Sequence, residues 1–451
     1  MWLRRIVLVV SLSAVAGDNV WATDLLELYE QTLATHPLIK GHEFSIEKAE
    51  AEKDQALSKL LPQVSAVGNL SWNEMTQPQT NTTTRQTSSQ TNQYEGTRGI
   101  VQAKQALFDL PSFLRWQGAK SVVLQSEQEL EAARMSVSAD LVVRYLDTLQ
   151  AEDELRYLQG EKALTEGDMK RIRRMHELKL VQVTDLYEVE AYYQSLLSKE
   201  LEAAGVREIA LEKLHETSGT PVTAIQPLNE ALLPPLSGDV NQWVADALSG
   251  HPSVLALSHS IEAAQKLIYG AHMEHAPQVA LQVSETYADN GGYDNRQLPH
   301  YNVGTVGLQL NVPIYSGGAV EAGARNAVAN YHQSLEKRTE KLREIERETR
   351  TAYVQARTWR ARIESSEQEV KAREKARDAQ QRSYELGVTT IVDVLESKKN
   401  WLKALFEHAK ARYEFIRSLV ALKLWRGTLD RPDIEEINAW LDRRNVAVSA
   451  R

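Results

Sequence analysis

Hydrophobic and polar residues alternate in four short segments, as expected for strands that are apolar on one face. In 64–72 the even positions hold Val, Ala, Gly, Leu and Trp, and in 306–314 they hold Val, Leu, Leu, Val and Ile. The segments 279–284 and 101–107 alternate similarly, the second more loosely. We therefore predict strands at about 62–73, 98–109, 277–289 and 301–315.

Aromatic residues lie near the ends of these segments: Trp72, Tyr287 and Tyr301 at one end, Phe108 and Tyr315 at the other. Each segment has the roughly 9–11 residues that a tilted strand needs to cross hydrocarbon, and aromatic girdles mark the rims of outer-membrane barrels. Two amphipathic hairpins packed on a helix are the alternative. The polar stretches 73–98 and 289–300 are predicted to be solvated external loops.

Apolar residues recur at helical spacing over much longer stretches, as in Val137, Leu141, Tyr145 and Leu149. We predict long helices at about 112–178, 182–218, 318–386 and 390–427. A helix of about 65 residues is about 100 Å long. No globular domain needs that length, so the pattern indicates a coiled-coil rod or tube.

The same plan occurs twice in the chain. His36-Pro37 recurs as His251-Pro252, and Glu177-Leu178 recurs as Glu385-Leu386. Proline suits the first turn of a helix, so both histidines are interpreted as helix-start residues rather than ligands. We predict a first structural repeat at 23–236 and a second at 237–451, the second ending in a short C-terminal segment.

The N-terminus has the pattern of a secretory signal peptide. Arg4 and Arg5 precede an apolar run, and cleavage after Ala22 would leave a mature start at Thr23. A short membrane anchor is the alternative, but the run is too short to span a bilayer. No later stretch approaches 18 apolar residues, so any crossing of a membrane must use strands.

Composition and motifs exclude several classes of function. The net charge of −9 argues against general nucleic-acid binding. The chain has no cysteine, which removes disulfides, thiolate metal sites, cysteine nucleophiles and lipid-bearing cysteines. We find no phosphate loop, HExxH motif or nucleophile elbow, and expect no enzyme and no cofactor. His272, His275 and Glu274 are the one candidate metal cluster, but two histidines in one turn are more often incidental.

Four strands cannot close a barrel, and an unpaired strand edge is not tolerated in lipid. The chain is therefore expected to oligomerise in a lipid bilayer. Totals of 8, 12 or 16 strands all satisfy this requirement.

Several motifs in order along the duplicated chain resemble the TolC family of outer-membrane efflux proteins. They are Leu25-Leu26-Glu27-Leu28-Tyr29, Leu60-Leu61-Pro62-Gln63, Leu107-Phe108-Asp109, the segment 312–318 (VPIYSGG) and the segment 384–396 (YELGVTTIVDVLE). The resemblance covers essentially the whole mature sequence. The absence of cysteine places the chain outside the family's lipid-anchored branch.

This resemblance implies a mainly α fold with a membrane β-barrel part. Three subunits would close one 12-stranded barrel, and twelve helices would continue it as a tunnel across the periplasm. The implied function is an outer-membrane exit duct for toxic compounds, secreted proteins or both. The implied partners are outer-membrane lipid, a periplasmic adaptor and an inner-membrane pump of the ABC, RND or MFS type.

The resemblance also assigns roles at the periplasmic tip. Asp393 and Glu396 match carboxylates that form a ring at the pore constriction, and their i, i+3 spacing puts both on one helical face. Such a ring attracts cations, and crowding in it would raise some carboxyl pKa values. A capping box of Thr390 with Asp393 is the alternative reading, and both roles are compatible. Glu188, the repeat partner of Glu396, is expected on the outer coil.

Thr184, Asp185 and Tyr384 match family residues that hold the closed tip through polar links between the two coiled coils. A basic family residue in this set is replaced by Thr389, which predicts a weaker latch or one built from other residues. The implied adaptor-docking tips are Leu178, Leu180 and Val181 in the first repeat, and Leu386, Gly387 and Val388 in the second. Lys179 stands where the second tip has glycine, so the first turn could differ.

A coiled-coil scaffold outside any membrane is the rival interpretation. It accounts for the long helices but not for the alternating strands or the signal peptide. Solubility that depends on detergent would distinguish a channel from such a scaffold.

Overall fold

The computed structural model describes residues 24–80, 82–83, 85–229, 233–236, 238–289 and 300–441, without the side chains of Gln79 and Thr80. The predicted signal peptide and residues 290–299 of the predicted second loop lie outside the described residues. The chain divides into two compact units. Unit 1 comprises Met1–Pro37, Arg134–Trp243 and Glu348–Arg451, and unit 2 comprises Leu38–Ala133 and Val244–Arg347.

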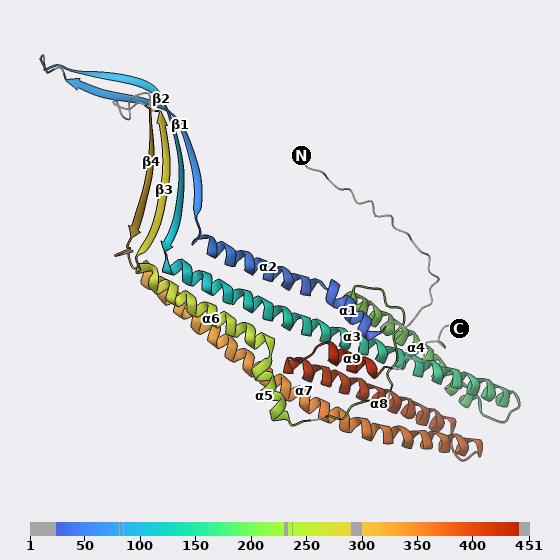
Figure 1. Cartoon of the computed structure of the whole chain (residues 1–451). Helices are drawn as coiled ribbons and strands as arrows, with labels where there is room; N and C mark the ends of the chain where they lie inside the picture. Colours follow the sequence, from blue (N-terminus) through green and yellow to red (C-terminus); the bar gives the residue numbers. More distant parts are fainter. Residues whose placement is uncertain are drawn as a thin grey trace, which may run out of the picture. The chain divides into compact units, whose positions relative to one another are not determined.

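Unit 2 contains a four-stranded antiparallel sheet in the order β1-β2-β3-β4 (Figure 1). The strands are β1 (Gln63–Thr80), β2 (Thr87–Phe108), β3 (Gln278–Asp289) and β4 (His300–Asn311). The two hairpins join through pairing of β2 with β3. In the described chain, β1 and β4 each have one neighbour, so the sheet has two unpaired edges.

The first hairpin is much longer than the sequence pattern predicts. The polar sequence of 73–98 predicts a loop, but β1 and β2 continue in unbroken register as far as Thr80 and Thr87. Threonine favours extended backbone, and polar cross-strand pairs such as the Thr76 and Thr91 hydroxyls, 2.9 Å apart, add to the ladder. Both faces of this part of the hairpin are polar, which indicates a two-stranded ribbon exposed to solvent. A polar stretch without hydrophobic alternation can therefore still form strands.

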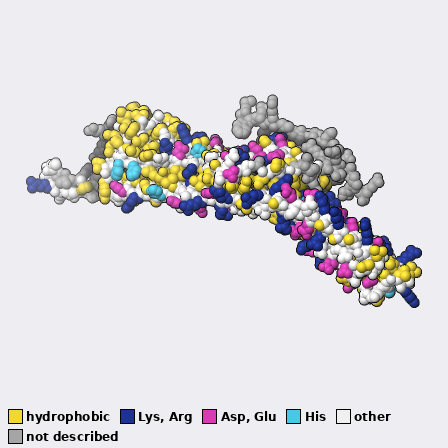
Figure 2. Space-filling model, turned by 90° about the horizontal axis from the view of Figure 1, so that it is seen from below, with side chains coloured by type: hydrophobic (Ala, Val, Ile, Leu, Met, Phe, Trp, Pro, Cys, Tyr) yellow, Lys and Arg dark blue, Asp and Glu magenta, His cyan; other side chains and the backbone are white. Residues whose placement is uncertain are grey.

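The paired segments give the sheet one apolar face and one polar face. On the apolar face, Val64 pairs with Ala103, Ala103 with Val283, and Val283 with Val306. The large side chains of this face are exposed, Leu70 to 82% and Val306 to 74%. Figure 2 shows hydrophobic side chains gathered over the part of unit 2 that carries the strands. On the polar face, Ser65, Gln102, Ser284 and Thr305 form one row across the four strands.

The helices of unit 2 include α2 (Pro37–Ser58), most of α5 (Val240–Gly250), α6 (Pro252–His272) and the 3-10 turn η2 (Met273–His275). His251 is the N-cap of α6, and its Nδ1 accepts a hydrogen bond from the Ser253 backbone N–H at 3.1 Å. The helix-start role predicted for this histidine is confirmed. Burial lowers the pKa of His251 to about 4, with Lys341 nearby adding to the shift.

Two very long helices, α3 (Leu110–Glu177) and α7 (Ala319–Glu385), contribute residues to both units. Their 68 and 67 residues correspond to about 100 Å each. In unit 1 they accompany α4 (Val183–Ser218) and α8 (Ile391–Arg426), so the unit holds two helical hairpins. Among the described helices, none is both long and apolar enough to cross a membrane.

The main core of unit 1 lies where α1 (Leu25–Thr35) and α9 (Arg431–Ala439) pack with the helical hairpins. Leu28, Tyr145 and Phe415 are buried there. The Tyr145 hydroxyl accepts a hydrogen bond from the Gln226 backbone N–H at 2.9 Å, which fixes the linker after α4 to α3. This core anchors both hairpins and leaves their turns at the far ends of the helices.

Candidate functional site at the helix tips

The two hairpin turns of unit 1 have the same backbone geometry. At the first turn the Leu180 N–H donates to the Met175 carbonyl at 2.9 Å, and at the second the Val388 N–H donates to the Ser383 carbonyl at 2.9 Å. Lys179 has a φ of 59° and Gly387 has a φ of 74°. The lysine therefore adopts the left-handed conformation that glycine takes easily, at some cost in free energy.

The predicted docking residues are mostly exposed at these turns. Leu178, Leu180, Leu386 and Val388 are 64%, 67%, 79% and 75% exposed. Val181 differs, because it is partly buried against a small apolar core next to the turns, which includes Ile172 and Val394. Each turn thus presents two large apolar side chains to solvent on a fixed backbone.

The predicted carboxylates lie at the start of α8, next to the second turn. Thr390 is the N-cap, and it forms a reciprocal capping box with Asp393, as the sequence indicates. The Asp393 carboxylate accepts hydrogen bonds from the Thr390 N–H at 3.0 Å and from the Thr390 hydroxyl at 2.7 Å. These hydrogen bonds lower the pKa of Asp393, so the cap favours its ionised form.

Asp393 and Glu396 are both exposed, whereas Ile391, Val394 and Leu395 of the same helix are buried. The two carboxylates therefore share the face of α8 that points away from the small core. Glu188, on α4, is also exposed. Each chain therefore exposes two carboxylates on this side of α8.

A small apolar core holds the two hairpins together at the tips. It contains Ile172 of α3 and Val189 of α4, packed with Ile391, Val394 and Leu395 of α8. Tyr384 of α7 is partly buried against this core. All four long helices therefore meet at this core, next to the turns.

The predicted latch residues lie near one another but are not joined by hydrogen bonds in the described chain. The Tyr384 hydroxyl is buried and has no hydrogen-bond partner among the described residues. Burial raises its pKa, and the nearby Asp185 raises it further. The Thr184 hydroxyl donates to the Gln182 side chain at 3.4 Å instead. The Thr389 hydroxyl is likewise buried without a partner in the described part of the chain.

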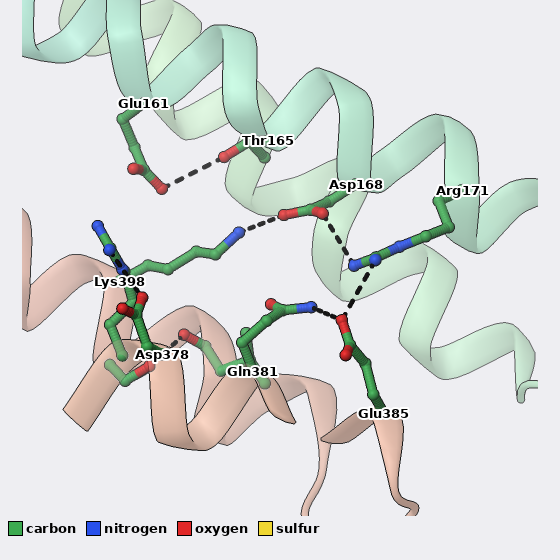
Figure 3. Close-up of polar contacts among 11 residues, drawn as sticks. Glu161, Thr165, Asp168, Arg171, Asp378, Gln381, Glu385 and Lys398 are labelled. Carbon is green, nitrogen blue, oxygen red and sulfur yellow. Dashed lines mark hydrogen bonds and ion pairs between the residues drawn. The ribbon is translucent and has the colours of Figure 1, made fainter. Parts of the chain in front are cut away.

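A different polar network links the hairpins (Figure 3). Asp168 of α3 is paired with Lys398 of α8 and, at 3.0 Å, with Arg171 one turn further along α3. Arg171 also reaches Glu385 of α7 at 3.5 Å, and Gln381 donates to Glu385 at 3.1 Å. Two ion pairs thus connect α3, in the first helical hairpin (α3 and α4), to both helices of the second helical hairpin (α7 and α8).

A buried carboxylate lies two turns before this network on the same helix. Glu161 is 3% exposed, and it accepts a hydrogen bond from the Thr165 hydroxyl at 3.4 Å. Burial raises the pKa of Glu161, while the positive charges of Lys398 and Arg377 oppose that shift. Figure 3 shows Glu161, Thr165 and Asp168 along one side of α3, facing the second hairpin.

Sequence reasoning missed this network, although a signal was present. Leu158, Thr165 and Ile172 form a buried stripe on α3 at a seven-residue period. Glu161 and Asp168 also lie seven residues apart on that side of the helix. Charged residues on a buried helical stripe require partners from a neighbouring helix.

Two members of the candidate metal cluster in unit 2 contact other groups instead of one another. His275 Nδ1 lies 2.8 Å from the Pro313 carbonyl oxygen, and Glu274 is paired with Arg115. The described residues contain no group of three or more histidine, cysteine or carboxylate side chains placed to hold a metal ion.

Comparison with known proteins shows what this arrangement is similar to. The sequence model of the family described as outer membrane efflux protein matches residues 28–220 and 243–428. The chain is 26% identical to the alkaline protease secretion protein AprF of Pseudomonas aeruginosa, over 94% of this chain and 88% of that protein. It is 25% identical to the proteases secretion protein PrtF of Dickeya chrysanthemi, over 98% and 96%. It is 24% identical to the outer membrane protein TolC of Escherichia coli, over 94% and 86%.

Solved structures show the same fold. The Campylobacter jejuni CmeC outer membrane channel superimposes with a TM-score of 0.76 and 17% identity, covering 98% of both chains. CusC, described as forming a transmembrane channel, gives a TM-score of 0.78 with 15% identity over 92% of this chain and 95% of that one. The expected combination of long helices with part of a membrane β-barrel is confirmed.

Proposed function

Because the chain belongs to the outer membrane efflux protein family and is an outer-membrane channel subunit, we propose that three copies assemble into one trans-periplasmic duct. The observation that carries this proposal is the sheet, whose apolar face is exposed and whose edges on β1 and β4 are unpaired in the described chain. Lipid would cover the apolar face, and the edges would pair between subunits.

A trimer suits the size of the sheet. Three four-stranded sheets give twelve strands, an even number within the range of bacterial outer-membrane barrels. The polar face would then line a water-filled lumen. The long helices would continue the passage into the periplasm as a twelve-helix tunnel, with the helix tips at its far end.

The tip would act as a closed gate that an inner-membrane partner opens. Asp393 and Glu396 from three subunits would converge as a ring of carboxylates that favours cations. The ion pairs from Asp168 to Lys398 and from Arg171 to Glu385 would hold the two hairpins of each subunit together. They would supplement the latch expected from Thr184, Asp185 and Tyr384, in which Thr389 replaces a basic residue.

The exposed apolar tips would be the contact for a periplasmic adaptor, which recruits an inner-membrane pump of the ABC, RND or MFS type. Relatives named for protease secretion favour a protein cargo delivered by a type I system. A relative named outer membrane efflux protein, BepC of Brucella suis, supports efflux of small compounds as the second candidate. In this account the chain conducts cargo and contributes no catalytic residue.

The absence of cysteine from the native sequence makes a site-specific test possible, because any introduced cysteine is unique. A photoreactive maleimide on Leu386→Cys, at the second tip, should crosslink an adaptor in cells. The same probe on Lys375→Cys, exposed on α7 ten residues before the helix ends at Glu385, should give much less adaptor adduct. Mass spectrometry of the adduct would identify the adaptor. Equal labelling from both positions would contradict docking at the tips.

A further inference from the structure

The two faces of the sheet carry charges of opposite sign. On the polar face, β2 contributes Arg98 and Lys104, whose register neighbours are Asn69 and Ala288 for the arginine and Gln63 and Gln282 for the lysine. The acidic residues of the strands have the opposite parity and belong to the other face: Glu74, Glu95, Glu285 and Asp289. Among the described residues, neither Arg98 nor Lys104 has a carboxylate within ion-pair distance.

A cleft of about 250 Å³ lies on this polar face, at the end of the sheet where β1 begins. We call it the basal cleft. Its polar lining combines two lysines with four side-chain amides: Lys59, Lys104, Gln63, Gln278, Gln309 and Asn311. All of these residues belong to unit 2. The register places Gln63 directly beside Lys104, and Gln278 beside Asn311.

The one carboxylate among the described residues that line the basal cleft is already engaged. Both oxygens of Asp109 accept hydrogen bonds from Ser112, at 3.0 Å from its backbone N–H and 2.7 Å from its hydroxyl. Asp109 therefore satisfies the start of α3 and does not neutralise the lysines through an ion pair. The cleft keeps an excess of positive charge.

The donors in the cleft define the ligand chemistry. An ammonium group offers three N–H donors and no acceptor, and each amide offers two N–H donors. One donor of Gln63 is already used, because its Nε2 donates to the Ser58 carbonyl at 3.4 Å. Oxyanions such as phosphate and carboxylate are the groups that such a set recognises, because each oxygen accepts charge-assisted hydrogen bonds. A metal cation would be repelled by the two lysines.

We propose that the basal cleft is an oxyanion-binding site for carboxylate or phosphate groups of solutes that pass through the barrel. The inference rests on the proposed function, which makes the polar face the lumen. Three copies of the cleft would surround the passage, so the barrel entrance would be cationic although the tip is anionic. Cargo that has crossed the acidic ring would meet a segment that retains its anionic groups.

Inorganic phosphate is the simplest probe of the site. Single channels of the full protein would be recorded in a zwitterionic phosphatidylcholine bilayer, with phosphate added on the side opposite the helices. The wild type should show a saturable, phosphate-dependent reduction of current. Lys59→Gln with Lys104→Gln should raise the half-blocking concentration about tenfold or more, as expected from the loss of charge-assisted hydrogen bonds.

A matched control uses Lys48→Gln with Lys53→Gln, which removes the same charge from α2 outside the cleft. This control should retain the wild-type response, and Arg98→Gln should change it only weakly. Equal phosphate sensitivity in wild type and in the cleft variant would overturn the proposal. So would loss of sensitivity in Arg98→Gln alone, which would indicate a general lumen charge. Absence of any channel in the wild type would instead contradict the proposed function.

Discussion

The Lys398 ammonium of α8 contacts the Asp168 carboxylate of α3, so an ion pair joins helices that belong to different hairpins. Lys398 is only 8% exposed, and solvent screens a buried pair less than a surface pair. Loss of one partner from a buried pair is costly because the other charge is left without its counterion. We therefore expect opening of the tip to begin with separation of this pair.

Substitution of Lys398 by glutamine should loosen the closed tip. Asp168 would keep Arg171 as a partner, so the fold should survive while the link between hairpins weakens by about 1–3 kcal/mol. We expect higher single-channel conductance or more frequent openings. Lys162→Gln is the control, because Lys162 pairs with Glu200 of α4 within the same hairpin. Equal conductance together with an equal frequency of openings in Lys398→Gln and wild type would contradict a latch role.

Replacement of both ring carboxylates, Asp393→Asn with Glu396→Gln, should reduce the preference for cations in a salt gradient. Glu396→Gln alone should already lower it, because Glu396 takes no part in the capping box. Reversal potentials measure the effect directly. Glu188→Gln, on the other hairpin, should leave the potential unchanged. Unaltered selectivity of the double variant would reject the ring.

The turn at Gly387 should tolerate a side chain poorly. Its φ of 74° is left-handed, so Gly387→Ala should destabilise unit 1 by about 1–2 kcal/mol. Gly167→Ala in the interior of α3 should instead stabilise slightly, by about 0.5–1 kcal/mol, because no atom lies within 4 Å of the added methyl group. Thermal unfolding would compare the two, and equal shifts in the same direction would contradict the turn geometry.

Acid should destabilise unit 2 through His251. Its pKa is lowered to about 4 in the folded state, while the unfolded chain has the ordinary value near 6.5. The unfolded state therefore binds the proton first, and stability is lost as the pH falls from about 6.5 towards 4, by at most about 3 kcal/mol. His251→Asn keeps an N-cap residue and should remove this part of the pH dependence. An identical pH profile for the variant would contradict the assignment.

The sequence predicted the secondary structure where hydrophobic residues recurred at a single regular spacing. Alternation located the sheet strands, helical spacing located α3 and α7, and the spacing of Thr390 and Asp393 predicted the capping box. The ribbon at 73–98 gave no periodic signal because both of its faces are polar. Lys179 could not be placed from sequence, since a positive φ at lysine depends on the fold around it.

The tip network was hidden for a related reason. Charged residues on long helices usually belong to solvated faces, and Asp168 and Lys398 are 230 residues apart in sequence. Only the packing of α3 against α8 brings them together. The absence of a hydrogen bond to Tyr384 within the described chain could not be predicted either, because it depends on the same packing.

The most direct test of the account is the mass and activity of the mature protein extracted from membranes in mild detergent. Native mass spectrometry should give three copies of the chain, and the same sample should insert into a planar bilayer and conduct ions. A water-soluble monomer that neither binds lipid nor conducts would contradict the claim that copies of this sheet complete one barrel.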